Sequence, residues 1–152
     1  MATQVAVIGS GAEHEPRAEE VGRLLAEREC TVVTGGLGEV MAAACRGAKS
    51  AGGTTVGILP GESRFDANPW VDHAVVTGIG HARNLVVAAS GDAVIAIGGG
   101  WGTLAEIGFA LRLGRPVVIL EPGHEVPGVP RAATPREAVE LALELLLRQR
   151  RD

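Results

Sequence analysis

Residues 98 to 103, GGGWGT, are the segment of the chain best suited to chemistry, because they join an apolar run to a helical pattern predicted from Leu104. The four glycines lack Cβ atoms, so backbone N–H groups are free to approach an anion, and the helix start adds its positive dipole end. We therefore predict a cradle for the phosphate of a small molecule, made by Gly98, Gly99, Gly100, Trp101, Gly102 and Thr103.

Arg83 and Glu106 are the charged residues placed to act beside this loop. Both lie near a predicted helix start that follows a strand, so a cation and a carboxylate are expected to face one crevice. An alternative stays open for each. Thr103-x-x-Glu106 fits a capping box, in which the carboxylate bonds the Thr103 N–H, and Arg83 fits a solvated helix residue.

The elements that position these residues are short β-branched runs alternating with helical patterns. The pattern predicts an α/β fold, with a Rossmann-like, doubly wound, mainly parallel sheet flanked by helices in one domain of residues 1 to 152. A Pro- and Gly-rich surface loop is expected over 121 to 134 and a final helix over 135 to 149, capped by Thr134 and Glu137. The predicted strands cover 5–9, 31–35, 54–59, 73–78, 92–98 and 116–120.

Four glycine-bearing turns follow predicted strands and should gather at one edge of the sheet, where such folds bind ligands. Besides the 98–103 loop, these are the turns at 9–11, at 34–36 and at 78–83. Together with the loop they predict one binding site, to which Gly9, Ser10, Gly11, Gly35, Gly36, Arg83 and Asn84 are added as ligand-binding candidates.

Composition excludes several other classes of function. The net charge of −4 and the scattered basic residues argue against a nucleic-acid partner. No apolar run has membrane-spanning length, and Cys30 and Cys45 are expected as buried, reduced thiols, so we expect a cytoplasmic protein without a membrane partner. The four histidines lack metal-ligand spacing, so no metal site is predicted.

Two cofactor chemistries are also disfavoured. The first turn has His14 where the third glycine of a dinucleotide fingerprint belongs, and no acidic residue ends the second strand. Lys49, the only lysine, lies late in a predicted helix, away from any glycine loop, which excludes a Walker A loop and argues against a pyridoxal-phosphate Schiff base. We therefore expect that no cofactor is required for catalysis.

The segment HARNLVVAASGDAVIAIGGGWGTLAEIGFAL resembles the signature region of the "Lonely Guy" cytokinin-nucleotide phosphoribohydrolases, long mislabelled lysine decarboxylases. It resembles the related molybdenum-cofactor carrier proteins still more, and TGGLGEVMAAACRGAKSAGGTTVGILP extends the likeness over about residues 4 to 120. By this resemblance Arg83 and Glu106 fall on the hydrolases' two catalytic positions. Gly98 and Asn84 depart from the hydrolases' Pro and Lys and resemble the carrier branch.

The resemblance implies a protein that binds a phosphorylated small molecule, most like a molybdenum-cofactor carrier, with the cofactor or a nucleotide as ligand. A nucleoside 5′-monophosphate phosphoribohydrolase and a nucleotide sensor without chemistry are the alternatives. Trp101 is either a ligand contact or an interface aromatic. The last predicted helix carries more leucines than one sheet face covers, and the Ala-rich helix over Met41–Ala48 offers a second surface, so a homo-oligomer, a dimer or tetramer, is expected.

Overall fold

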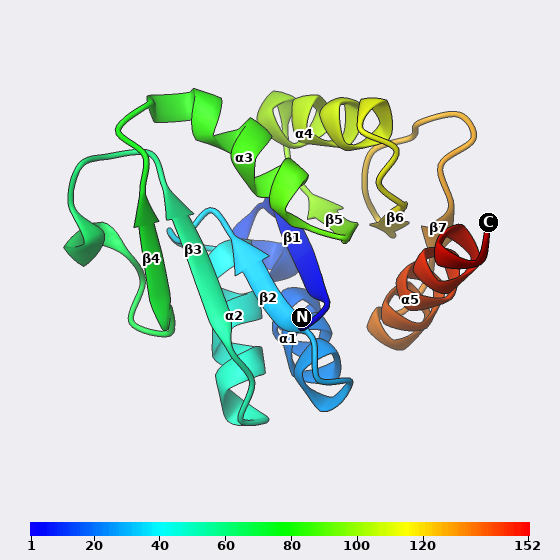
Figure 1. Ribbon diagram of the computed structural model, residues 1–152, viewed down its shortest axis with the longest axis horizontal. Helices are drawn as coiled ribbons and strands as arrows, with labels where there is room; N and C mark the ends of the chain where they lie inside the picture. The colour runs from blue at the N-terminus through cyan, green and yellow to red at the C-terminus, as the bar shows by residue number, and fades with distance from the viewer.

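One seven-stranded sheet forms the centre of the computed structural model, which describes residues 1 to 152. The strands lie in the order β4-β3-β2-β1-β5-β6-β7, and every neighbouring pair is parallel (Figure 1). The predicted α/β, doubly wound fold is confirmed, and each predicted strand is present within about two residues of its expected bounds. The strands are β1 (Gln4–Ser10), β2 (Thr31–Thr34), β3 (Thr55–Leu59), β4 (His73–Val76), β5 (Ala93–Gly98), β6 (Val117–Leu120) and β7 (Arg131–Ala132).

Helices cover both faces of the sheet, with α1, α2 and α5 on one face and α3 and α4 on the other (Figure 1). Side chains of β1 alternate between the two cores, because successive strand residues point to opposite faces: Val5 and Val7 lie under α1 and α2, and Ala6 and Ile8 under α3 and α4. The helices are α1 (Glu15–Glu27), α2 (Val40–Ser50), α3 (Arg83–Ser90), α4 (Trp101–Arg112) and α5 (Pro135–Arg151), with 3-10 turns η1 (Ala12–His14), η2 (Arg64–Asp66) and η3 (Gly80–Ala82).

Helix α2 is buried against α1, so the expectation that Met41–Ala48 offers a surface to another copy is wrong. A Cβ on Gly22 of α1 would lie 1.9 Å from the carbonyl oxygen of Ala44, and one on Gly47 of α2 would lie 1.8 Å from that of Glu19. The small side chains thus serve a close helix contact inside this chain.

Helix α4 begins at Trp101, three residues before the predicted Leu104. Its N-cap is Gly100, which supplies no side-chain cap, and Thr103 and Glu106 are buried inside the helix. The capping box is therefore absent, because Glu106 lies in the second turn and not at the third helical position.

The C-terminal segment differs from its prediction in two ways. The 121–134 connection contains β7, whose Arg131 and Ala132 pair in parallel with Ile119 and Leu120 of β6. Helix α5 has the predicted cap, since Glu137 N donates to Thr134 Oγ1 over 3.2 Å, but it runs on to Arg151.

The expected leucine patch on α5 is small. Leu146 is buried, Leu141, Leu143 and Leu145 are half-buried against the core, and only Leu147, at 52% exposure, faces solvent. The helix covers more of the sheet face than its wide apolar stripe suggested, because it packs on α1 as well as on β5, β6 and β7.

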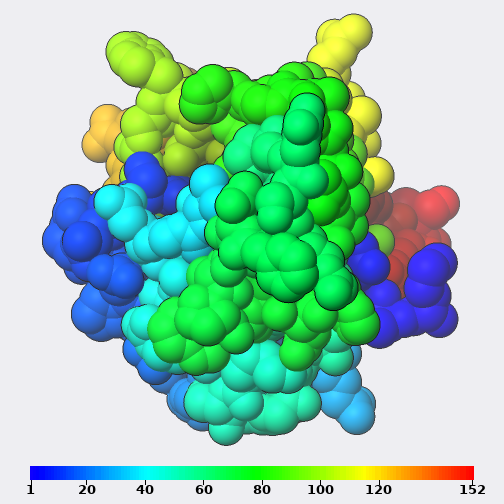
Figure 2. All heavy atoms as spheres, turned by 90° about the vertical axis from the view of Figure 1, so that its left-hand side faces the viewer, coloured from blue at the N-terminus to red at the C-terminus, as the bar shows by residue number.

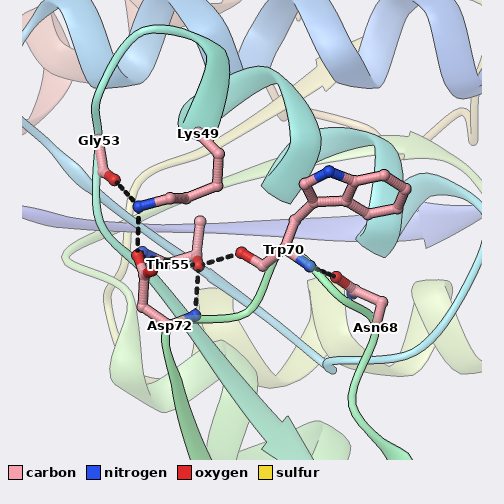
Figure 3. A network of polar contacts seen from close by, with 6 residues as sticks. All are labelled: Lys49, Gly53, Thr55, Asn68, Trp70 and Asp72. Carbon is pink, nitrogen blue, oxygen red and sulfur yellow. Dashed lines mark hydrogen bonds and ion pairs between the residues drawn. The ribbon is translucent and has the colours of Figure 1, made fainter.

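The connection from β3 to β4 lacks a long helix and is held by a polar network (Figure 3). Asp72 accepts hydrogen bonds from Lys49 Nζ at 2.9 Å and from Thr55 N at 3.0 Å, and Thr55 Oγ1 donates to the Trp70 carbonyl over 2.6 Å. Burial raises the pKa of Asp72, but the Lys49 and Thr55 bonds outweigh it and lower the pKa overall. The only lysine of the chain is therefore a structural partner of this connection.

The β4 edge of the molecule is formed by β4 and the connection that precedes it (Figure 2). Val75, Val76 and the nearby Phe65 and Ile79 are exposed there.

None of the five helices combines the length and apolar character that crossing a bilayer requires.

Candidate functional site

The strand order reverses between β1 and β5, and two cavities lie at the carboxyl ends of these strands. The first, of about 360 Å³, is bordered by the ends of β1 and β2, by α3 and by the start of α4. The second, of about 590 Å³, lies against η1 and the 122–124 segment. Ser10 lines both cavities, and the glycine loop contributes Gly98 and Gly99 to the second and Gly100 to the first.

The glycine loop presents unpaired N–H groups at this junction. The N–H groups of Gly99 and Gly100 donate to no protein acceptor. Those of Trp101, Gly102 and Thr103 form the first turn of α4, where an N–H has no acceptor within the helix. No side chain caps this turn, so the loop can offer several donors to one anion.

Close packing explains two of the four glycines of this loop, Gly98 and Gly99. At Gly99, with φ +95°, a Cβ would lie 2.1 Å from Thr103 Oγ1, and at Gly98, with φ +58°, it would lie 2.2 Å from the ring of His14. A Cβ on Gly100, by contrast, would meet no atom within 4 Å and would project into open space. The first two glycines allow the fold, and the third leaves room beside the loop.

Arg83 lies at the start of α3, buried to 9% exposure, with its guanidinium over Gly35: a Cβ there would lie 2.9 Å from Arg83 Cζ. The side chain makes one hydrogen bond, from Nη1 to Asn84 Oδ1, and its buried Nε has no partner. Because an arginine can only donate, Asn84 turns its oxygen to Arg83 and its Nδ2 toward Gly102 at the start of α4. The surface-residue alternative for Arg83 is excluded.

Glu106 lines the same cavity and is 7% exposed. Its carboxyl group forms no hydrogen bond with another protein group. Burial raises its pKa to about 7, although the positive charge of Arg83 opposes the shift. Burial also lowers the pKa of Arg83, and the carboxylate of Glu106 opposes that shift in turn. A carboxyl group that titrates near neutrality inside a cleft has the character of a general acid or base.

Most of the predicted ligand-binding residues lie together. Two do not line either cavity: Gly36 is packed under Leu59, and Trp101 extends into solvent at 86% exposure. The residues that line one or both cavities are Gly9, Ser10, Gly11, Gly35, Arg83, Asn84, Gly98, Gly99, Gly100, Gly102, Thr103 and Glu106. The side chains of the chain form no group of three or more that could hold a metal ion.

Sequence reasoning missed several lining residues. In the sequence, His14 stands where a dinucleotide fingerprint has its third glycine. That replacement was the one sequence signal that could have marked His14 as a site residue. Val7 and Ile8 lie in the predicted first strand and His81 in the predicted turn at 78–83, but sequence reasoning did not single out their side chains. The others come from α2, η1 and the 122–124 loop, which only the tertiary structure brings to the cleft. The missed residues are Val7, Ile8, Met41 and His81 in the first cavity and Glu13, His14, Pro122, Gly123 and His124 in the second.

Comparison with known families and sequences gives three kinds of relative. The family model described as "LDcluster4: SLOG cluster4 family" matches residues 2–144. An uncharacterized protein of Archaeoglobus fulgidus is 42% identical over 143 residues, covering 92% of this chain and 94% of that protein. Cytokinin riboside 5′-monophosphate phosphoribohydrolases of Rhodococcoides fascians and Mycobacterium tuberculosis are each 35% identical, over 66% and 70% of this chain. The alignments span only 53% and 63% of the hydrolases' own length.

Solved structures similar to this one include two associated with the molybdenum cofactor. The molybdenum cofactor binding protein of Rippkaea orientalis superposes with a TM-score of 0.89 at 33% identity, covering 96% of this chain and 98% of that one. The molybdenum cofactor carrier protein of Chlamydomonas reinhardtii gives 0.84 at 33% identity, covering 97% and 99%. The likeness to both thus extends over nearly the whole of each chain.

Proposed function

The chain belongs to the SLOG cluster4 family, and we propose that it binds a phosphorylated small molecule at the glycine loop, as a carrier of the molybdenum-cofactor kind. The single observation that carries the proposal is the set of unpaired N–H groups from Gly99 to Thr103, on a loop that borders both cavities and has no side-chain cap. The full-length likeness to two molybdenum-cofactor proteins supports the choice of ligand class.

The residues of the site fit the phosphate of such a ligand. The amides of the glycine loop would hold its oxygens, and Asn84 Nδ2 and the Thr103 hydroxyl would add donors from either side. The buried Arg83, whose Nε has no partner, would supply positive charge within the same cavity. Ser10, Gly9, Gly11 and Gly35 would complete the walls. The ligand is cargo here, so binding needs no catalytic group.

A titration with adenosine 5′-monophosphate tests this proposal. Gly100→Val places a branched side chain in the open space beside the loop, where an added Cβ meets no atom within 4 Å. Because Gly100 has φ −109° and ψ −143°, outside the regions that residues with a Cβ favour, circular dichroism of the variant checks its fold. We expect the variant to fold normally and to lose at least about a hundredfold in affinity, as for several charge-assisted hydrogen bonds lost together. Gly38→Val is the control, since a Cβ there also meets nothing and Gly38 lines neither cavity. Equal affinity of wild type and Gly100→Val would contradict the proposal.

Phosphoribohydrolase activity is the second candidate, favoured by one observation, the pKa of about 7 of the buried Glu106 beside Arg83. In that reaction water adds to C1′ of the ribose, the C1′–N bond breaks, and the base leaves with the electron pair and takes up a proton. Ionised Glu106 would stabilise the positive charge developing at C1′ and accept the proton that the attacking water loses, the leaving base would take its proton from solvent, and Arg83 would position ribose or phosphate. A nucleotide sensor would use the same cradle without these steps.

We also propose that the protein assembles through α3 and α4. The two helices contain three charged residues, and two of these, Arg83 and Glu106, are buried. Their outer face carries exposed apolar or small residues: Leu85, Trp101, Ala105, Gly108 and Leu111. The third charged residue, Arg112, is exposed at the end of α4, and the rest of the outer face is uncharged. A helix layer with so little charge on its outer face is typical of an interface, and a dimer with a second copy would cover it.

The two free, buried cysteines fit a reducing compartment, so the proposal places the protein in the cytoplasm.

A further inference from the structure

The second cavity contains two histidines, His14 and His124, that the proposed function leaves unused. Its nine lining residues include no hydrophobic one, and they bring Ser10, His14 and His124 to one space beside Gly98 and Gly99. A cavity of about 590 Å³ is large enough for a substantial part of a ligand. Its walls suit hydrogen-bonding groups better than an aromatic ring, because stacking needs an apolar face.

Arg17 fixes the orientation of His14. The guanidinium of Arg17 bonds the carbonyl oxygens of Glu121 and Pro122 and also His14 Nδ1. Since an arginine can only donate, Nδ1 of His14 accepts and the ring proton is on Nε2. The His14 side chain is 14% exposed, and its ring lies between Gly11 and Gly98. His14 therefore offers an N–H donor to the cavity with a positive charge directly behind it.

Two carboxylates of this chain already lie on donors of the second cavity. Glu39 Oε2 accepts from Gly11 N at 2.7 Å, and Glu13 Oε1 lies 3.4 Å from His14 Nε2. Glu39 holds φ +55°, a region that residues with a Cβ rarely adopt, and its side chain does not cap α2. Both residues are exposed and free to turn away into solvent. The Gly11 N–H thus binds a carboxylate oxygen in the structure as it stands, and a second carboxylate lies close to His14 Nε2.

We propose that the second cavity is a second oxyanion site, so that the preferred ligand is a diphosphate and not a monophosphate. One phosphate would lie on the glycine loop, and the next would cross Ser10 to reach His14 Nε2 and Gly11 N, displacing the carboxylates of Glu13 and Glu39. This inference rests on the proposed function, because it extends a ligand already held at Gly99 to Thr103.

Titrations with ADP and with AMP, on wild type and two variants, test the inference. Wild type should bind ADP at least about tenfold more tightly than AMP, the gain expected from charge-assisted hydrogen bonds to a second phosphate. His14→Phe keeps a ring and removes the N–H donor. The affinity for ADP should therefore fall to the level of the affinity for AMP, while the affinity for AMP should not change. Glu39→Gly removes the competing carboxylate and should raise ADP affinity about tenfold, a gain that misfolding cannot produce.

Glu29→Gly is the matched control for Glu39→Gly. Glu29 is the other non-glycine residue at positive φ, +59°, and its replacement changes backbone and charge in the same way at a position that lines neither cavity. It should leave ADP affinity unchanged. Equal binding of AMP and ADP by wild type, or a gain that Glu29→Gly reproduces, overturns the inference and leaves the proposed function standing. Failure of wild type to bind AMP at all contradicts the proposed function itself.

Discussion

Arg83 and Glu106 are buried in one cavity, and the guanidinium of Arg83 gives its only hydrogen bond to Asn84 and not to Glu106. The positive charge of Arg83 therefore lowers the pKa of the Glu106 carboxyl group without a hydrogen bond between them. Burial, which raises this pKa, has the larger effect. An ion pair with good geometry would have kept Glu106 ionised. The arrangement leaves both groups available to a ligand.

Glu106 should make the ligand-free protein less stable as the pH rises. Its pKa is about 7 when folded and 4.5 as the ordinary value, so between these pH values the folded state binds a proton that the unfolded state has lost. The free energy of unfolding then falls with rising pH, by about 3 kcal/mol in total. Denaturant unfolding at pH 4.5 and pH 8 should show Glu106→Gln more stable than wild type at pH 8 only. The same difference at both pH values would contradict the shifted pKa.

Adenine release from AMP separates carrier from hydrolase. As a carrier, the wild type should release no free adenine above background. If Glu106 is catalytic, release is measurable, and Glu106→Gln should lower it at least about a hundredfold with little change in affinity, since such a group acts mainly in the transition state. Adenine release that depends on Glu106 would overturn the carrier proposal in favour of the hydrolase.

Asp72 should contribute to stability without affecting the ligand. Asp72→Asn weakens the bonds to Lys49 and Thr55 that hold the β3 to β4 connection, at a cost of about 1 kcal/mol at pH 7. Because the pKa of Asp72 is lowered by folding, this contribution is present above its ordinary pKa and is lost as the pH falls through the folded value. Thermal unfolding and AMP titration together check the result, and reduced AMP affinity would show that the connection supports the site.

Light scattering at micromolar concentration tests assembly through α3 and α4. Gly108 lies on the outer face of α4, where an added Cβ meets nothing within 4 Å, so Gly108→Glu should leave the monomer intact and place a charge in the interface. We expect a dimer or larger mass for wild type and a monomer mass for Gly108→Glu. Leu147→Glu on α5 is the control and should remain assembled. A monomeric wild type would refute the proposal, and a dimer broken only by Leu147→Glu would place the interface on α5.

The sheet and its helices were predictable because strands buried on both faces have continuous apolar runs. The failures were local. The start of α4 was missed because Trp101 and Gly102 are poor helix signals and Gly100 offers no cap. Strand β7 was missed because it has only two residues and forms only through its tertiary pairing with β6. The surplus of leucines on α5 was overestimated because a sequence does not say that α1 also covers that helix.

The glycine loop and Arg83 could be found from sequence because both lie in glycine-bearing segments that connect a strand to the next helix. The second cavity could not be found from sequence. The orientation of His14 depends on its contact with Arg17, and His124 lies more than 100 residues after His14 in the chain. Neither the burial of Glu106 nor the bond between Arg83 and Asn84 has a sequence signature. The charge state of the site is thus a property of the packed structure.

Native mass spectrometry of gently purified protein tests the central claim most directly. Wild type, Gly100→Val and Gly38→Val would be compared for a noncovalently bound small molecule, identified by its mass after release. We predict that wild type and Gly38→Val carry a phosphorylated pterin or nucleotide and that Gly100→Val is empty. A phosphorylated ligand retained equally by Gly100→Val, or a wild type that carries none and binds no AMP on titration, would contradict the claim that the glycine loop is a phosphate cradle.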